Sequence, residues 1–186
     1  WRLVGEVLQT YLVIDTPDEM LLIDKHAAHE RILFERFRAQ QAPMMSQALL
    51  EPVPAGLDQA ESDAVLAARE TLAPFGYGLE PGDDGSAQLT RIPAELDTAE
   101  AVAGLQELAA LLLEGHSPDP VAMRDTALHT IACKAAIKAG SPSGQAELEA
   151  LAREVLTREE IKYCPHGRPV CIRLTRSALD RQFGRG

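Results

Sequence analysis

The feature that most constrains this chain is a junction between an apolar run of strand length and a run of helix-forming residues. Residues 20–23 are apolar, and residues 27–37 then favour helix. His26 and Glu30 are four residues apart, so a helix places both side chains on one face. Asp24 lies just upstream, where it can fold back towards the same place. The junction therefore predicts half of a metal site.

Two neighbouring polar residues do not fit this arrangement. Glu35 follows His26 by nine positions, which at about 100° per residue places it roughly 180° around the helix. Its expected partner is Arg31, one helical turn earlier. We expect His29 on the surface of the helix rather than in the site.

Length and composition limit the class of protein. The 186 residues, 46% of them hydrophobic, can bury a core as one domain or as two small subdomains. No apolar run is long enough for a membrane span, and no signal segment is present, so neither is expected. Three irregularly spaced cysteines predict free thiols and a cytoplasmic location. Because Trp1 falls inside an expected strand, we expect the chain to be part of a longer protein.

The charge of the chain bears on possible nucleic-acid binding. The formal net charge is −10, which is the wrong sign for a module that holds nucleic acid unaided. If DNA is the substrate, another partner must supply much of the affinity.

The order of expected elements indicates an α/β (α+β) fold with two subdomains. Strands are expected over residues 3–14, 20–23, 75–79, 87–92 and 170–174. Helices are expected over residues 58–72, 98–114, 119–140 and 145–159, and from Ser177 onwards. The proline-bounded segment 47–54 cannot be helical throughout, so we expect a subdomain boundary there.

A second cluster of possible metal ligands lies near the C-terminus. Cys164 and His166 are separated only by Pro165, which favours an extended Cys164, so both side chains point the same way. Joined with the first cluster, they form a mixed sulfur, nitrogen and oxygen set that suits zinc or another transition ion. Taken alone, such a pair is more often a packed thiol beside a solvated histidine. We therefore expect residues 1–46 and 120–186 to form one sheet-containing unit, with 47–119 inserted.

Other polar residues have ordinary structural explanations. His129 and Cys133 are surrounded by Ala, Ile and Leu, which predicts core positions in a buried helix. Lys134 and Lys138 are more typical of a solvated face than of a phosphate contact.

Four short segments, in order, resemble the signature of the C-terminal domain of endonuclease-type MutL mismatch-repair proteins. They are Asp24-Lys25-His26-Ala27 with Glu30 and Glu35, similar to DQHA(X)2E(X)4E; Ala132-Cys133-Lys134, similar to ACR; Cys164-Pro165-His166-Gly167-Arg168-Pro169, which matches CPHGRP; and Phe183-Gly184-Arg185, similar to FxR. Lys25 replaces Gln and Lys134 replaces Arg. Weaker metal binding and a phosphate contact are both open consequences of Lys25.

The resemblance implies a homodimeric domain that nicks double-stranded DNA with a divalent ion, zinc tuning the site and manganese supporting turnover. It implies catalytic roles for Asp24, His26 and Glu30. It keeps Cys164 and His166 as ligands and adds Cys133, and so contradicts the core explanation of Cys133. It implies supporting roles for Glu35, Lys134, Arg168, Phe183 and Arg185.

The same resemblance implies partners and the roles of the subdomains. ATP would bind only to an N-terminal domain outside this chain, and a mismatch-recognition protein would bind the full-length chain. The outer unit would form the homodimer, with candidates for its core or interface at Val13, Val170 and Ile172, and 47–119 would be regulatory. Gln47, Leu49, Leu50 and Pro52 resemble the family's motif for the replication sliding clamp.

Two alternatives remain open from the sequence. The domain could be a non-catalytic dimerisation module with a structural or regulatory zinc site, which closed coordination by four protein ligands would favour. The segment 47–52 could be an ordinary linker that packs Leu49 and Leu50 into the core.

Overall fold

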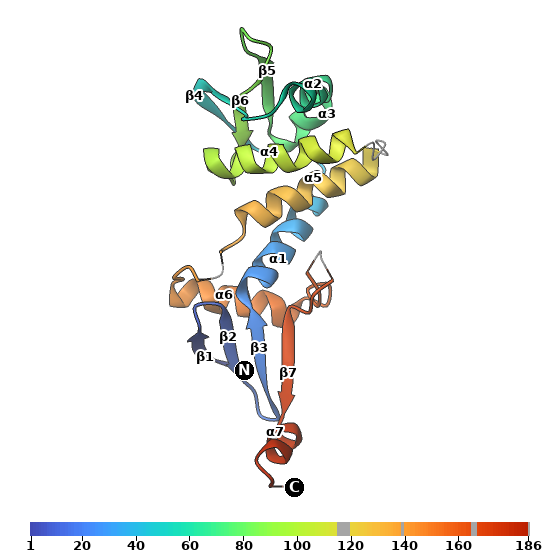
Figure 1. Ribbon diagram of the computed structural model, residues 1–186. Coiled ribbons are helices and arrows are strands. Elements are labelled where there is room, and N and C mark those ends of the chain that lie inside the picture. Colours follow the sequence, from blue (N-terminus) through green and yellow to red (C-terminus); the bar gives the residue numbers. More distant parts are fainter. Residues whose placement is uncertain (115–119, 139, 165–166, 186) are drawn as a thin grey trace. The chain divides into compact units, whose positions relative to one another are not determined.

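The computed structural model describes the chain in two units (Figure 1). The residues that it describes are 1–114, 120–138, 140–164 and 167–185. Unit 1 comprises Trp1–Leu33 with Ala136–Gly186, and unit 2 comprises Phe34–Ala135. Both units contain a sheet and helices, so the fold is α+β, as expected from the order of elements. Among the described residues, no helix is long and apolar enough to cross a membrane.

The unit boundaries differ from those expected at residues 46 and 120. They fall within helix α1 (Lys25–Ala39) and at the end of α5 (Pro120–Ala135). The reason is side-chain packing between the second half of α1 and α5. Phe34 meets the ring of His129 edge-on at 6.2 Å, and Arg38 lies 3.6 Å from the Asp125 carboxylate. These contacts join both helical segments to unit 2.

Unit 1 is built on a four-stranded antiparallel sheet. Its strands, in the spatial order β1-β2-β3-β7, are Arg2–Val7, Tyr11–Asp15, Glu19–Asp24 and Cys171–Thr175. The expectation of one strand over 3–14 was wrong, because the chain reverses at Leu8 and Gln9. Both residues have positive φ, 54° and 49°. Non-glycine residues rarely adopt this conformation, so the sequence carried no turn signal there.

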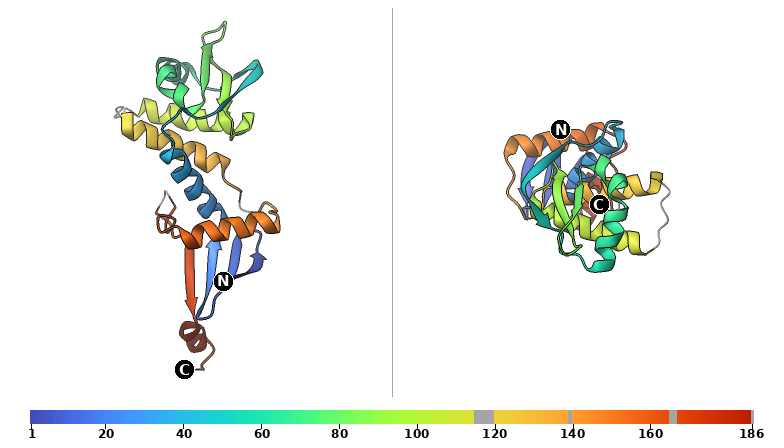
Figure 2. Two further views of the ribbon diagram at one scale, coloured as in Figure 1. Left: turned by 180° about the vertical axis from the view of Figure 1, so that it is seen from behind. Right: turned by 90° about the horizontal axis from the view of Figure 1, so that it is seen from above.

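Helix α6 (Gln145–Thr157) covers one face of this sheet (Figure 2). Because strand side chains alternate between faces, the sheet residues that contribute to this core are Leu12, Ile14, Leu21 and Ile23. Val13, Leu22 and Ile172 lie opposite one another in register on the other face. Ile172 is 54% exposed there, whereas Val170 is buried in the core. Helix α7 (Arg176–Gln182) follows β7.

Unit 2 holds a three-stranded antiparallel sheet with helices around it. Its strands, in the spatial order β4-β6-β5, are Ser46–Pro54, Ala87–Pro93 and Gly78–Pro81. Its other helices are α2 (Gln59–Ala67), α3 (Arg69–Leu72), the 3-10 helix η1 (Ala73–Phe75) and α4 (Thr98–Leu113). Capping boxes begin α2 and α4. Helix α5 ends at Ala135 rather than at the expected Gly140.

Candidate metal centre

The junction between β3 and α1 positions the first cluster of polar side chains. Asp24 ends β3, and its backbone N–H donates to the carbonyl of Val170 at 3.0 Å. Its Oδ1 accepts from the N–H of Ala27, also at 3.0 Å, so Asp24 caps the N-terminus of α1. A carboxylate is favourable at this end of a helix, where the N–H groups point outwards. The cap uses one carboxylate oxygen and leaves acceptor capacity on the other.

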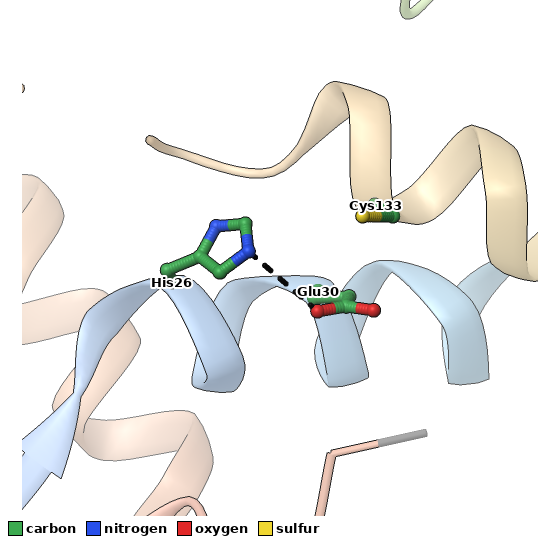
Figure 3. Close-up of side chains that lie close together, drawn as sticks. All are labelled: His26, Glu30 and Cys133. Atoms are coloured by element: carbon green, nitrogen blue, oxygen red, sulfur yellow. Dashed lines mark ion pairs between the residues drawn. The ribbon is translucent and has the colours of Figure 1, made fainter. Parts of the chain in front are cut away.

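His26 and Glu30 lie one turn apart on α1 and face each other (Figure 3). Their closest approach, Nε2 to Oε2, is 3.7 Å. The Glu30 side chain is almost fully buried, while that of His26 is 32% exposed. A buried carboxylate beside a partly open imidazole offers oxygen and nitrogen donors at one point on the helix.

The backbone of Ile137 determines which nitrogen of His26 is available. His26 Nδ1 lies 2.9 Å from the Ile137 carbonyl oxygen, which can only accept. The hydrogen must therefore be on Nδ1, and in the neutral ring Nε2 carries the lone pair. This is the usual arrangement of a metal-binding histidine, whose other ring nitrogen donates to a carbonyl or carboxylate. Nε2 is the nitrogen that faces Glu30.

His29 has a defined structural role that the sequence did not predict. Its Nδ1 accepts from the N–H of Ile137 at 3.0 Å, and its side chain is half-buried. The expected surface position is therefore wrong. The imidazoles of His26 and His29 thus hydrogen-bond to the C=O and the N–H of the same residue, Ile137. Their i, i+3 spacing was visible in the sequence, but the partner lies 108 residues away from His29.

Cys133 and Lys134 lie on α5, in unit 2. Cys133, the third side chain labelled in Figure 3, is half-buried rather than a full core residue. Lys134 forms an ion pair with Glu107 of α4. The Lys134 side chain is half-buried, and its role stays a prediction.

Cys164 lies in the core of unit 1 and is 4% exposed. Its N–H donates to the Arg168 carbonyl at 2.8 Å, and its carbonyl accepts from the Gly167 N–H at 2.9 Å. These bonds tie Cys164 to Gly167 and Arg168, and the Arg168 side chain is exposed. His166 is outside the described residues. A shared ion between Cys164 and the ligands of α1 therefore stays a prediction. Glu35 is half-buried on α1, in the part that belongs to unit 2.

Comparison with known proteins identifies the family. Residues 4–143 match the family model described as the MutL C terminal dimerisation domain. The chain belongs to this family. It is 36% identical over 185 residues to the DNA mismatch repair protein MutL of Kosmotoga olearia, and the match covers 99% of this chain and 30% of that protein.

Two other MutL proteins match the chain over nearly its whole length. The MutL of Caldanaerobacter subterraneus subsp. tengcongensis is 33% identical over 184 residues, covering 99% of this chain and 31% of that protein. That of Caulobacter vibrioides is 34% identical over 184 residues, covering 97% of this chain and 29% of that protein. The chain thus spans about three tenths of the length of these curated MutL relatives.

The segment that resembles a clamp-binding motif lies on β4, the edge strand of the MutL domain's second sheet. Pairing with β6 is interrupted between Ala48 and Val53, so residues 49–52 bulge from the ladder. Leu50 is fully exposed, Pro52 is exposed and Leu49 is half-buried. The alternative that packs both Leu49 and Leu50 into the core is therefore wrong, because Leu50 is exposed. The Gln47 side-chain amide donates to the Leu96 carbonyl at 2.9 Å.

The C-terminal FxR segment lies at one end of the first sheet, and the cluster of Asp24, His26 and Glu30 lies at the other. Glu19, at the start of β3, pairs with Thr175 immediately before α7, whereas α1 follows the other end of β3. The five residue steps between these ends span about 17 Å. Phe183 is largely exposed, and the Arg185 guanidinium lies 5.9 Å from its ring centroid. Within one chain, the sheet thus separates these two residues from His26.

Proposed function

We propose that this chain is the metal-dependent DNA-nicking domain of a MutL-type mismatch-repair protein, and also its homodimerisation module. The observation that carries the proposal is the paired presentation of His26 Nε2 and the buried Glu30 carboxylate on one face of α1. A histidine whose tautomer is set for ligation, beside a buried acid, is difficult to explain by packing alone.

The donor chemistry of this site fits a divalent transition ion. Imidazole nitrogen and carboxylate oxygen suit zinc or manganese, and a thiolate would favour zinc further. Asp24, His26 and Glu30 would hold the ion, with Cys133, Cys164 and His166 as the further ligands that the resemblance implies. When bound, such an ion would polarise a phosphodiester and activate water for attack on phosphorus.

The chain's own residues would prepare this chemistry in three ways. Ile137 holds the His26 ring by its Nδ1–H, which keeps Nε2 directed at Glu30. Asp24 is tied to the start of α1 by its cap, which limits its rotation. Burial of Glu30 strengthens its attraction for a cation, because little water screens the charge.

The uncovered face of the first sheet supports the dimer. Val13, Leu22 and Ile172 form a row across its three neighbouring strands, and Ile172 is largely exposed. Val4 and Val7 of β1 are exposed as well. Because exposed apolar patches of this kind usually mark interaction sites, we place a second copy on this face. Val170 is a core residue and not a candidate for the interface.

The bulged edge strand supports recruitment by a ring-shaped sliding clamp. A net charge of −10 disfavours direct binding to DNA, whereas docking to a ring that already encircles DNA raises the local substrate concentration. Leu50 and Pro52 are exposed in a segment where strand pairing is interrupted. The variant Gln47→Ala with Leu49→Ala should lose clamp-stimulated nicking, while Met45→Ala, an exposed apolar control just before β4, should retain it.

The deciding experiment is nicking of supercoiled plasmid with added manganese or zinc. Asp24→Asn protein should lose the metal-dependent activity, and Asp83→Asn, an exposed turn residue, should keep it. Equal activity of wild type and Asp24→Asn would refute the proposed site. Zinc binding without any nicking by the wild type, with clamp present, would instead support a non-catalytic dimerisation module.

A further inference from the structure

Lys25 stands between two proposed metal ligands, yet its side chain does not face the site. It is fully buried, at 0% exposure, which is exceptional for a lysine. Its ammonium group lies 2.5 Å from Glu6 Oε1 of β1 and donates to the carbonyl of Ser141. A contact between Lys25 and a phosphate in solution is therefore excluded, because the ammonium is fully buried and already has two partners.

One of the two partners of Lys25 connects it to the segment that follows α5. The Ser141 carbonyl belongs to that segment, as does Ile137, which is bonded to both His26 and His29. The N–H of Gly140 donates to the Gln9 carbonyl at 2.9 Å. The first turn of α1 thus holds this segment at Ile137 through two imidazoles and at Ser141 through an ammonium.

The charge balance explains why Glu6 is part of the arrangement. A buried ammonium group without a counter-charge is strongly unfavourable, and a carbonyl alone does not neutralise it. The Glu6 side chain is only 15% exposed and supplies that charge from the edge strand β1. An uncharged amide at position 25 would need no such acid.

We propose that Lys25, with Glu6 as its counter-ion, is a positioning residue for His26. It fixes the backbone at Ser141, four residues after Ile137, and Ile137 in turn fixes the tautomer and direction of the His26 ring. The metal-binding consequence depends on the function proposed above, whereas the effect on the ring itself does not. Lys25 would touch neither metal nor DNA.

The test uses the whole chain, labelled with ¹⁵N in its five histidines. Long-range ¹H–¹⁵N correlation spectra of the metal-free protein, at a pH about two units above the ordinary histidine pKa, distinguish the two neutral tautomers. Wild-type His26 should be in the Nδ1–H form. Lys25→Met should mix the tautomers of His26 and weaken zinc binding about 10- to 100-fold, the usual cost of losing a group that orients a ligating histidine.

A rescue variant distinguishes a positioning role of Lys25 from a role in stability alone. Lys25→Gln combined with Glu6→Gln should restore the Nδ1–H tautomer, since an amide can donate to the Ser141 carbonyl and leaves no buried charge. Lys162→Met, which removes an exposed lysine paired with Glu159 in the same unit, is the matched control and should change neither readout. If Lys25→Met does not fold, Lys25→Met with Glu6→Met replaces it, and mixed tautomers are again expected.

The outcomes are distinguishable. A folded Lys25→Met protein, or the double Met variant, with the wild-type tautomer and zinc affinity would overturn the inference. If the wild type binds no zinc but the tautomer of His26 changes in the variants, the positioning role stands and the proposed metal function fails.

Discussion

The first turn of α1 and the bulge of β4 are both candidate functional segments, and they are built in opposite ways. Around α1, Lys25 is fully buried, Glu30 is nearly so, and His26 is bonded to a backbone carbonyl. In the β4 bulge, Leu50 is fully exposed and the strand pairing is interrupted. A metal site needs ligands fixed before the ion arrives, whereas a docking segment leaves its apolar side chains for the partner to bury.

The largest effect is expected at the ligands of α1. Glu30→Gln keeps the shape of the side chain but removes the buried charge that faces His26. We expect metal-dependent nicking to fall by at least about 100-fold, because losing a ligand should cost no less than losing a group that merely orients one. Initial rates of plasmid nicking measure this effect. Retention of wild-type activity would show that α1 is not the metal site.

Dimerisation should respond to a charge placed on the open sheet face. Ile172→Asp puts two acids near each other at a two-fold interface, so we expect the dimer to weaken roughly 100-fold. Sedimentation equilibrium at tens of micromolar should then detect monomer, with Ile172→Val as the conservative control. A wild type that is itself monomeric at that concentration would end the dimer proposal for this face.

A third prediction measures how tightly α4 is packed in unit 2, the unit that contains the β4 bulge. A Cβ at Gly104 of α4 would lie 2.7 Å from the Tyr77 hydroxyl oxygen, which is too close. That hydroxyl is buried, has no hydrogen-bond partner among the described residues, and has a raised pKa because of burial and the nearby Glu107. Gly104→Ala should therefore cost about 1–3 kcal/mol of unfolding free energy.

Tyr77→Phe provides the matching control for that substitution. Removing the hydroxyl relieves the clash, so Tyr77→Phe with Gly104→Ala should recover most of the lost stability in urea denaturation. An equal loss in the single and double variants would show that the hydroxyl is not what limits the space at Gly104.

The smallest effect on stability is expected in the β4 bulge. Leu50→Ala removes an apolar side chain that the folded chain does not bury, so the free energy of unfolding should change by less than about 0.5 kcal/mol. Clamp binding by the same variant should weaken measurably in a surface-immobilised clamp assay. A large loss of stability would mean that Leu50 is buried in solution, and the contrast between the two segments would then disappear.

The features that could be predicted from sequence are those governed by local geometry. Helical periodicity places His26 and Glu30 on one face, and the acid before the helix becomes its cap at Asp24. Strand alternation separates Ile23 of the core from Leu22 of the open face. These relations involve residues within a turn or a strand of one another, so the backbone pattern alone determines them.

Other features depended on partners distant in the chain. Ile137, 111 residues from His26, determines which ring nitrogen has a lone pair, and Ser141 accepts from Lys25 across 116 residues. The reversal at Leu8 and the burial of Cys164 also arose only from the folded sheet and its core. Spacing along the chain determined which groups of the MutL domain could meet on α1. Only tertiary packing decided which groups are held there, because burial and hydrogen bonds to remote backbone set tautomer, charge pairing and exposure.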